Sequence, residues 1–139
     1  MRPRQTPPGS ATGTFYIKPV ISQLLRSYQP VAVHQQSFFI NDVPGDIAIT
    51  ADKNIFCTLL GSVLYMAGRC RRNTCIRVGA NISNGIIWIS IKDSSVLKSY
   101  TMLLGFEHLH LLAGKLGGNI SLPVEKENGG VVFSIPIAA

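Results

Sequence analysis

The spacing of apolar residues predicts that regular structure begins near Phe15. In the first apolar segment the spacing is the three and four residues of an amphipathic helix, at Val20, Ile21, Leu24, Leu25 and Tyr28. Pro19 suits the first turn of this helix, because an N–H is not needed there. Pro30 is expected to end it, because proline cannot continue the hydrogen-bond ladder.

Two short strands are expected next, over residues 37–41 and 47–50, with a proline- and glycine-containing turn between them. Asp52 is placed to cap the N-terminus of a second long helix. The apolar face of that helix has the spacing typical of a helix packed on a sheet, at Ile55, Phe56, Leu59, Leu60, Val63, Leu64 and Ala67. Gly61 and Gly68 are weak points in this helix.

The C-terminal half of the chain predicts a hairpin, a helix and a second hairpin. Residues 75–83 and 86–93 alternate around an Asn-Gly turn. Residues 103–116 predict a helix with one face made of Leu104, His108, Leu111, Leu112 and Lys115. A glycine pair ends that helix, and two strands over residues 119–125 and 131–137 close the chain. The order α-β-β-α-β-β-α-β-β predicts an α+β fold, a two-layer α/β sandwich. Its mixed, mostly antiparallel sheet is covered on one face by about three helices.

Length and composition are those of one domain. The chain has 139 residues, of which 46% are hydrophobic and 14% are charged. Residues 1–13 are rich in proline, glycine, serine and threonine, so we interpret them as a flexible head or linker remnant before a domain at 14–139. No apolar run approaches the length of a membrane span and no secretory signal opens the chain, which predicts a cytoplasmic location.

The formal net charge of +6 raises the hypothesis of nucleic-acid binding. Four cations gather near the end of the second helix, at Arg69, Arg71, Arg72 and Arg77. A solvated turn is the simpler interpretation, because the aromatic residues Trp88 and Tyr100 do not interleave with these cations. Three cysteines without zinc-ligand spacing, Cys57, Cys70 and Cys75, are expected to be reduced structural thiols.

Four sequence features occur in the order of a known family. Asp52 precedes the run Leu-Leu-Gly-Ser-Val-Leu-Tyr-Met-Ala at residues 59–67, and the strand of residues 86–93 ends at Asp93. A glycine, Gly105, precedes the last long helix, which runs into a glycine pair, and the chain closes on Gly-Val-Val-Phe-Ser-Ile-Pro at residues 130–136. From about Phe15 to Ile137 the chain resembles the ATP-binding domain of sensor histidine kinases, the Bergerat or GHKL fold.

The resemblance assigns a degenerate nucleotide site. Ser62 and Met66 stand where the family has two helix asparagines, of which the second holds Mg²⁺ against the phosphates. A register shifted by one residue would place Gly61 and Tyr65 there instead. Asp93 matches the aspartate that accepts a hydrogen bond from the adenine amino group. The family glycine two residues further on is Ser95, whose Cβ narrows the pocket.

The phosphate-binding segment is also reduced. Gly105 is the one phosphate-cradling glycine that remains, and the eleven residues at 94–104 leave little room for the mobile lid of the family. Lys98 could contact an anion, although a solvated loop lysine is the simpler interpretation. We assign no metal ligands and no catalytic residue.

The histidines do not supply the phospho-acceptor of a kinase. No acceptor hairpin fits in residues 1–14, and His34 is expected at the surface. His108 and His110, two residues apart on a helix, point to different faces and cannot chelate one metal ion. His108 is expected to pack in the core.

The resemblance therefore implies a degenerate histidine-kinase-type ATPase domain in bacterial signal transduction. ATP binding would be impaired or lost, no cofactor is expected, and the domain would act by binding a response regulator or another signalling protein. The alternative is a functional ATP-binding catalytic domain of a longer two-component sensor kinase, with ATP and Mg²⁺ as cofactors. The sequence leaves enzymatic activity and oligomeric state open.

Overall fold

The computed structural model describes residues 12–70, 72–93, 106–121 and 130–136. It begins with strand β1 (Thr12–Tyr16), helix α1 (Ile17–His34) and strands β2 (Phe38–Asn41) and β3 (Ala48–Asp52). Next come helix α2 (Lys53–Cys70) and strands β4 (Cys75–Ser83) and β5 (Ile86–Asp93). The last elements described are helix α4 (Phe106–Lys115) and strands β6 (Asn119–Ser121) and β7 (Gly130–Pro136).

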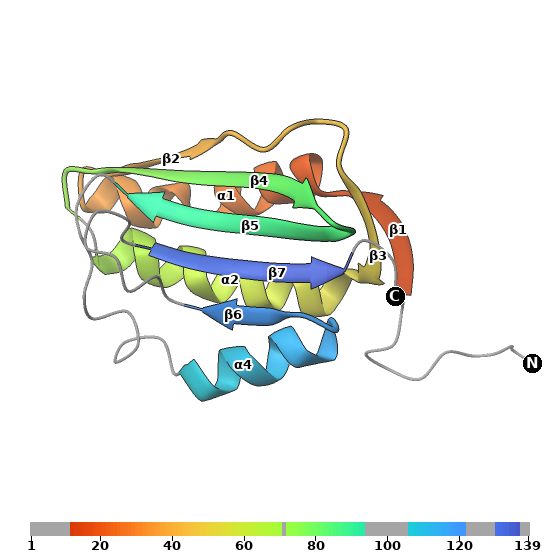
Figure 1. The fold of residues 1–139 in the computed structure, drawn as a ribbon. Coiled ribbons are helices and arrows are strands. Elements are labelled where there is room, and N and C mark those ends of the chain that lie inside the picture. Colours follow the sequence, from red (N-terminus) through yellow and green to blue (C-terminus); the bar gives the residue numbers. More distant parts are fainter. Residues whose placement is uncertain (1–11, 71, 94–105, 122–129, 137–139) are drawn as a thin grey trace, which may run out of the picture.

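The strands form a five-stranded sheet and a small separate pair. The main sheet has the order β2-β4-β5-β7-β6, in which only β2 and β4 are parallel. Strands β1 and β3 pair antiparallel beside it. Helices α1, α2 and α4 lie along one face of the main sheet (Figure 1). The predicted α+β two-layer sandwich, with a mixed, mostly antiparallel sheet covered on one face by about three helices, is therefore confirmed for the residues described.

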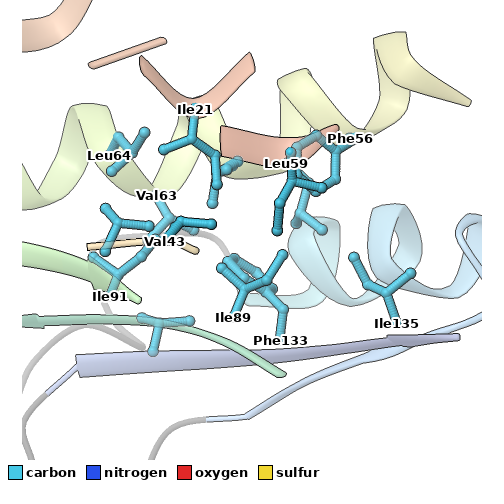
Figure 2. Close-up of a cluster of buried hydrophobic side chains, with 14 of the residues drawn as sticks. Ile21, Val43, Phe56, Leu59, Val63, Leu64, Ile89, Ile91, Phe133 and Ile135 are labelled. Atoms are coloured by element: carbon cyan, nitrogen blue, oxygen red, sulfur yellow. The ribbon is translucent and has the colours of Figure 1, made fainter. Parts of the chain in front are cut away.

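The core lies between the sheet and the helices. Phe56, Leu59 and Val63 of α2 lie over Ile89 and Phe133 of the sheet (Figure 2), and all five side chains are buried. Alternate residues of β5 are buried because side chains of a strand point to opposite faces in turn, and only one face of this sheet carries helices. The apolar spacing of α2 and of β5 thus determines how these two elements pack.

Strand β1 starts earlier than the sequence pattern indicates. Residues 12 and 13, which the pattern placed in the flexible head, pair with Asp52 and Ala51 of β3. The Thr14 and Thr50 hydroxyls also lie 2.8 Å apart across this pair. These residues lack apolar alternation because the strand is largely exposed, and its pairing partner is distant in sequence.

Helix α1 does not end at Pro30, so that prediction was wrong. Pro30 lies inside the helix, which continues to His34. The last turn has tertiary support, because Ala32 is fully buried and its backbone lies against Gly68 of α2. Packing of this turn against α2 offsets the free-energy cost of the helical hydrogen bond that Pro30 cannot form. Pro19 lies in the first helical turn, as predicted.

Helix α4 presents a different face from the predicted one. His108 is exposed and Leu111 is 67% exposed, whereas Leu109 and Ala113 are buried. The predicted packing of His108 in the core was therefore wrong, because the side of α4 that faces the core carries Leu109, the next residue. The predicted start of this helix, residues 103–105, lies outside the described residues. None of the helices described here has the length and apolar character needed to cross a bilayer.

Candidate functional site

Helix α2 holds two of the residues assigned to the nucleotide site, Ser62 and Met66. Asp52 begins the helix as predicted, since its Oδ1 accepts hydrogen bonds from the backbone N–H groups of Asn54 (3.0 Å) and Ile55 (3.2 Å). Ser62 and Met66 are one turn apart, lie on the same side of α2, and are both half-buried. The Ser62 hydroxyl donates a hydrogen bond to the Thr58 carbonyl oxygen at 2.8 Å.

The alternative register places its two residues against α1. The ring of Tyr28 packs over Gly61, where an added Cβ would lie 3.0 Å from the Tyr28 hydroxyl oxygen. Tyr65 meets the same ring edge to face, with centroids 6.1 Å apart. Because residues rotate by about 100° along a helix, Met66 lies about 140° away from Gly61. In the register with Ser62 and Met66, Met66 is therefore turned away from the contact with Tyr28, whereas Ser62 borders the same hollow as Tyr28.

The adenine-binding aspartate of the resemblance ends strand β5. The backbone of Asp93 pairs with Ile76 at the start of β4, which follows directly after α2. This end of β5 and the C-terminal end of α2 therefore lie at the same end of the molecule (Figure 1). The side chain of Asp93 and the residues Ser95, Lys98 and Gly105 lie outside the described part of the structure.

The arginines that suggested nucleic-acid binding engage different partners. Arg77 forms an exposed ion pair with Asp42, with a guanidinium-to-carboxylate distance of 2.7 Å. The hydrogen bond to Asp42 and its negative charge raise the pKa of Arg77. Arg69 instead lies over the ring of Tyr65 on α2, 5.7 Å from its centroid. These two side chains lie on the sheet and on the helix layer, so they do not form one phosphate-binding patch.

The remaining chemistry-bearing groups stay apart. His34 is exposed as predicted, and His108 and His110 are both exposed on α4. Cys57 and Cys75 carry free thiols. Burial raises the pKa of Cys57, and the nearby charge of Lys53 partly opposes that increase. Within the described ranges, no three His, Cys, Asp or Glu side chains are grouped closely enough to hold a metal ion.

The structure also shows an aromatic cluster that the sequence pattern did not reveal. The ring of Tyr28 on α1 meets the ring of Tyr65 on α2 edge to face, and the guanidinium of Arg69 lies over the Tyr65 ring. Tyr28 was assigned to the apolar face of its helix, and Tyr65 was considered only as an alternative ligand position. The four-residue spacing of Tyr65 and Arg69 was the available signal, since side chains at that spacing meet on a helix.

Comparison with solved structures identifies the fold. The chain superposes on the Acinetobacter baumannii histidine kinase AdeS with a TM-score of 0.79 at 13% identity, over 92% of this chain and 68% of that one. The catalytic domain of histidine kinase ThkA gives 0.79 at 14% identity, over 91% and 97% of the two chains. Full-length ShkA, solved in complex with AMPPNP, gives 0.77 at 17% identity, over 94% and 32%.

The sequence itself matches no protein-family model and no curated protein. The structural agreement nevertheless extends over nearly the whole chain and nearly all of the ThkA domain. The chain therefore has the fold of the ATP-binding catalytic domains of histidine kinases, as the sequence motifs predicted.

Proposed function

We propose that this chain is a degenerate histidine-kinase-type ATPase domain of bacterial signal transduction. It acts in the cytoplasm through protein–protein contacts, with ATP binding impaired or lost. The observation that carries the proposal is the pair Ser62 and Met66 on α2, at the positions where the family resemblance calls for two asparagines. The fold is retained while the ligands on its central helix are replaced.

The chemistry of these side chains does not fit Mg²⁺. Magnesium is a hard cation that prefers oxygen ligands in octahedral geometry, and a thioether is a soft donor. Met66 therefore cannot replace an amide oxygen. The Ser62 hydroxyl is shorter than an asparagine side chain, and its proton is directed to the Thr58 carbonyl within the same helix. We therefore assign no catalytic step through a magnesium–nucleotide complex.

The partner follows from the resemblance. Histidine kinases signal to response regulators, so a response regulator or another signalling protein is the partner that a domain of this fold would keep after losing nucleotide chemistry. AdeS and ThkA are each described as histidine kinases. In this chain the contact would regulate or recruit the partner and would not transfer a phosphoryl group.

Isothermal titration calorimetry with Mg-ATP and Mg-ADP tests the proposal. We expect no saturable heat at concentrations that would saturate a micromolar site. ShkA, which was solved with AMPPNP, is the positive control for the ligand and buffer. Micromolar binding of either nucleotide to this chain would refute the proposed loss of the site.

The alternative is a functional ATP-binding domain of a longer sensor kinase. Strand β5 ends at Asp93 in a fold that, in ShkA, was crystallised with a nucleotide analogue. On this alternative, replacement of Asp93 by Asn would remove the carboxylate that accepts the adenine hydrogen bond and would weaken binding by about tenfold or more. If the wild type binds ATP and Asp93→Asn binds it equally well, the adenine role of Asp93 is excluded.

A further inference from the structure

The face of the main sheet that is turned away from the helices carries an exposed tryptophan. Side chains of a strand alternate between the two faces of a sheet, and Ile87, Ile89 and Ile91 of β5 are buried. Trp88 therefore lies on the other face, which we call the open face because α1, α2 and α4 all lie on the opposite side (Figure 1). Trp88 is 39% exposed, although β5 is the central strand of this sheet.

The pairing of β2 with β4 adds a second aromatic residue to the open face. Phe39 and its partner Ile76 are both buried on the helix side of the sheet. Phe38 and its partner Cys75 therefore point to the open face, because neighbouring residues of a strand alternate. Phe38 is 50% exposed. Two aromatic rings are thus accessible from solvent on one side of the sheet.

The strand register gives the spacing of the two rings. Phe38 pairs with Cys75 and Trp88 pairs with Asn81, so their partners on β4 are six residues apart. The rings are also two strands apart, since β4 lies between β2 and β5. This places them about 20 Å apart along the strands and about 10 Å apart across them.

Two cations lie on the open face between these rings. Arg77 of β4 pairs directly with Lys92 of β5, and both side chains are exposed. Like charges directly opposite each other on a sheet are destabilising. Asp42 forms an ion pair with Arg77, whereas Lys92 has no carboxylate partner among the residues described. The open face therefore keeps a positive charge that the protein does not neutralise.

The other side chains of the open face leave the rings and the charge accessible. Trp88 is flanked by Asn81 on β4 and by Ser134 on β7, which are both short and polar. As far as β4, β5 and β7 are described, none of their positions on this face is an aspartate or a glutamate. The surface thus favours an anion that also has flat apolar groups.

The fold brings together residues that the sequence keeps apart. Trp88 does not interleave with Arg77 along the chain, but β5 returns antiparallel to β4 and places both residues on one face. Along the diagonal of the sheet the order is ring, two cations, ring. Surfaces that bind single-stranded nucleic acids have this pattern, because bases stack on aromatic rings and phosphates contact cations.

We propose that the open face binds single-stranded nucleic acid. Unpaired bases stack on Trp88 and Phe38, and the phosphates between them contact Lys92 and Arg77. The charge of this face selects a polyanion, and the exposed rings select one whose bases are unpaired over a duplex or an acidic peptide. The diagonal between the rings accommodates a segment of about four nucleotides. This surface lies across the sheet from α2, so the inference does not depend on whether α2 binds a nucleotide.

The fluorescence of Trp88 tests the proposal directly, because the chain contains one tryptophan. An oligothymidylate of about twelve nucleotides, titrated into the full chain, is expected to quench this emission saturably, since a base stacks on the ring. The anisotropy of a labelled copy of the oligonucleotide should give the same Kd. The proposal is overturned by the absence of saturable binding, or by binding that leaves the emission of Trp88 unchanged.

Two pairs of variants separate stacking from charge. Trp88→Ala should weaken binding at least about fivefold, whereas Tyr16→Ala, which removes an exposed ring from β1, should change it by less than about twofold. Lys92→Gln should make the slope of log K against log salt concentration less negative by about 0.7, the value for one phosphate contact of a single strand. Lys115→Gln removes an exposed charge from α4 and should leave the slope unchanged.

Equal effects within either pair would overturn the proposal, because the binding would then not depend on the open face. Trp88→Phe keeps a ring at the same position and should retain most of the affinity in the anisotropy measurement. Its comparison with Trp88→Ala, with circular dichroism of both variants, separates loss of stacking from loss of the fold. A loss in Trp88→Phe as large as that in a folded Trp88→Ala would also contradict stacking.

Competing polyanions test the selection of the ligand. A DNA duplex of the same length and inorganic polyphosphate should each displace the labelled oligonucleotide at least about tenfold less well, at equal phosphate concentration, because neither offers unpaired bases. Equal competition would show that charge alone drives the binding and would overturn the proposal.

The calorimetric titration with Mg-ATP distinguishes failure of this inference from failure of the proposed function. A chain that binds both Mg-ATP and the oligothymidylate contradicts the proposed loss of nucleotide binding but supports the open-face site. A chain that binds neither supports the loss of nucleotide binding and refutes the open-face site.

Discussion

At the scale of single residues, the glycine pair after α4 shows two different requirements for glycine. Gly117 has a φ of +77°, a left-handed conformation that favours glycine over other residues. Gly118 is required for space, because an added Cβ would overlap the Ser134 carbonyl oxygen and lie 3.1 Å from the Ile135 Cα. The pair therefore both ends α4 and allows the chain to pass closely over β7.

Replacement of Gly118 by alanine is expected to lower the free energy of unfolding by about 3 kcal/mol or more, since the obstructing atoms belong to the backbone. Urea unfolding followed by circular dichroism measures the change. Gly114→Ala is the matched control: it lies in α4 with nothing within 4 Å of the new Cβ. That variant should gain about 0.5–1 kcal/mol from helix propensity. Equal stability of the two variants would contradict the close approach at Ser134.

Asp52 determines where α2 begins, and its loss should be measurable. Its Oδ1 accepts two backbone N–H groups of the first turn, which have no partner within the helix. Asp52→Ala is expected to lower the free energy of unfolding by about 1 kcal/mol. Asp52→Asn keeps a capping oxygen and should retain most of that stability. A loss in Asp52→Asn as large as that in Asp52→Ala would show that the cap is not the source of the effect.

The reactivity of Cys57 reports on its neighbour Lys53. Burial raises the pKa of Cys57, and the charge of Lys53 lowers it. Lys53→Gln is therefore expected to raise this pKa further and to slow the reaction with a disulfide reagent at pH 8 by about twofold. Because the folded state favours the protonated thiol, Cys57 adds to the free energy of unfolding at neutral pH. This contribution is lost as the pH rises through the pKa of Cys57 in the folded state.

The measurement uses a chain in which Cys70 and Cys75 are replaced by serine, so that one thiol reacts. Lys115→Gln serves as the control, because it removes a similar exposed charge from α4. A rate that is insensitive to Lys53→Gln, or equally sensitive to both changes, would contradict the assigned electrostatic contact.

At the scale of elements, the contact between α1 and α2 explains the two glycines of α2. Gly61 and Gly68 are seven residues apart, so they lie on the same side of the helix, and both are buried against α1. A Cβ on Gly68 would lie 3.3 Å from the backbone nitrogen of Ala32 and 3.4 Å from the Phe39 ring. The sequence indicates only weak points in a helix, whereas the structure shows that these residues allow the two helices to approach closely.

Gly68→Ala should therefore lower the free energy of unfolding by about 1–2 kcal/mol, although alanine is the better helix former. Gly61→Ala is the control on the same helix and should cost less. Its new methyl group meets the far end of the Tyr28 side chain, at 3.0 Å from the hydroxyl oxygen, and a side chain can move more easily than a backbone. Thermal unfolding of the two variants checks this order, and a more stable Gly68→Ala variant would contradict the backbone contact.

The elements were predictable where the pattern is local. The spacing of α2, the Asp52 cap and the hairpin at Asn84 are encoded in neighbouring residues, and the structure confirms them. The extension of α1 through Pro30 was not predictable from neighbouring residues, because it depends on contacts with α2. Strand β1 was missed for a similar reason, since its strand conformation depends on pairing with β3, which is distant in sequence.

At the scale of the whole molecule, the fold was more predictable than the site. The order of elements and the motif positions were sufficient to identify the histidine-kinase catalytic fold, even though the structural relatives are only 13–17% identical. The candidate site depends on particular ligands, and sequence reasoning could name Ser62 and Met66 but could not show how they are held. The contact between the rings of Tyr28 and Tyr65 could not be predicted, because these side chains meet only when α1 and α2 pack.

The proposed loss of nucleotide binding has a consequence for the stability of the whole chain. A ligand that binds only the folded state stabilises it by RT ln(1 + [L]/Kd), which is about 4 kcal/mol for 1 mM ligand and a micromolar site. For a chain of this size such a gain would raise Tm by on the order of 10 °C. We expect Mg-ATP at 1 mM to shift the Tm of this chain by less than about 2 °C, measured by calorimetry. Magnesium chloride at matched ionic strength is the control for screening of the basic surface, and ShkA is the positive control. A shift of on the order of 10 °C with Mg-ATP and not with magnesium chloride would mean that the fold still binds nucleotide despite Met66, and would favour the functional ATP-binding alternative.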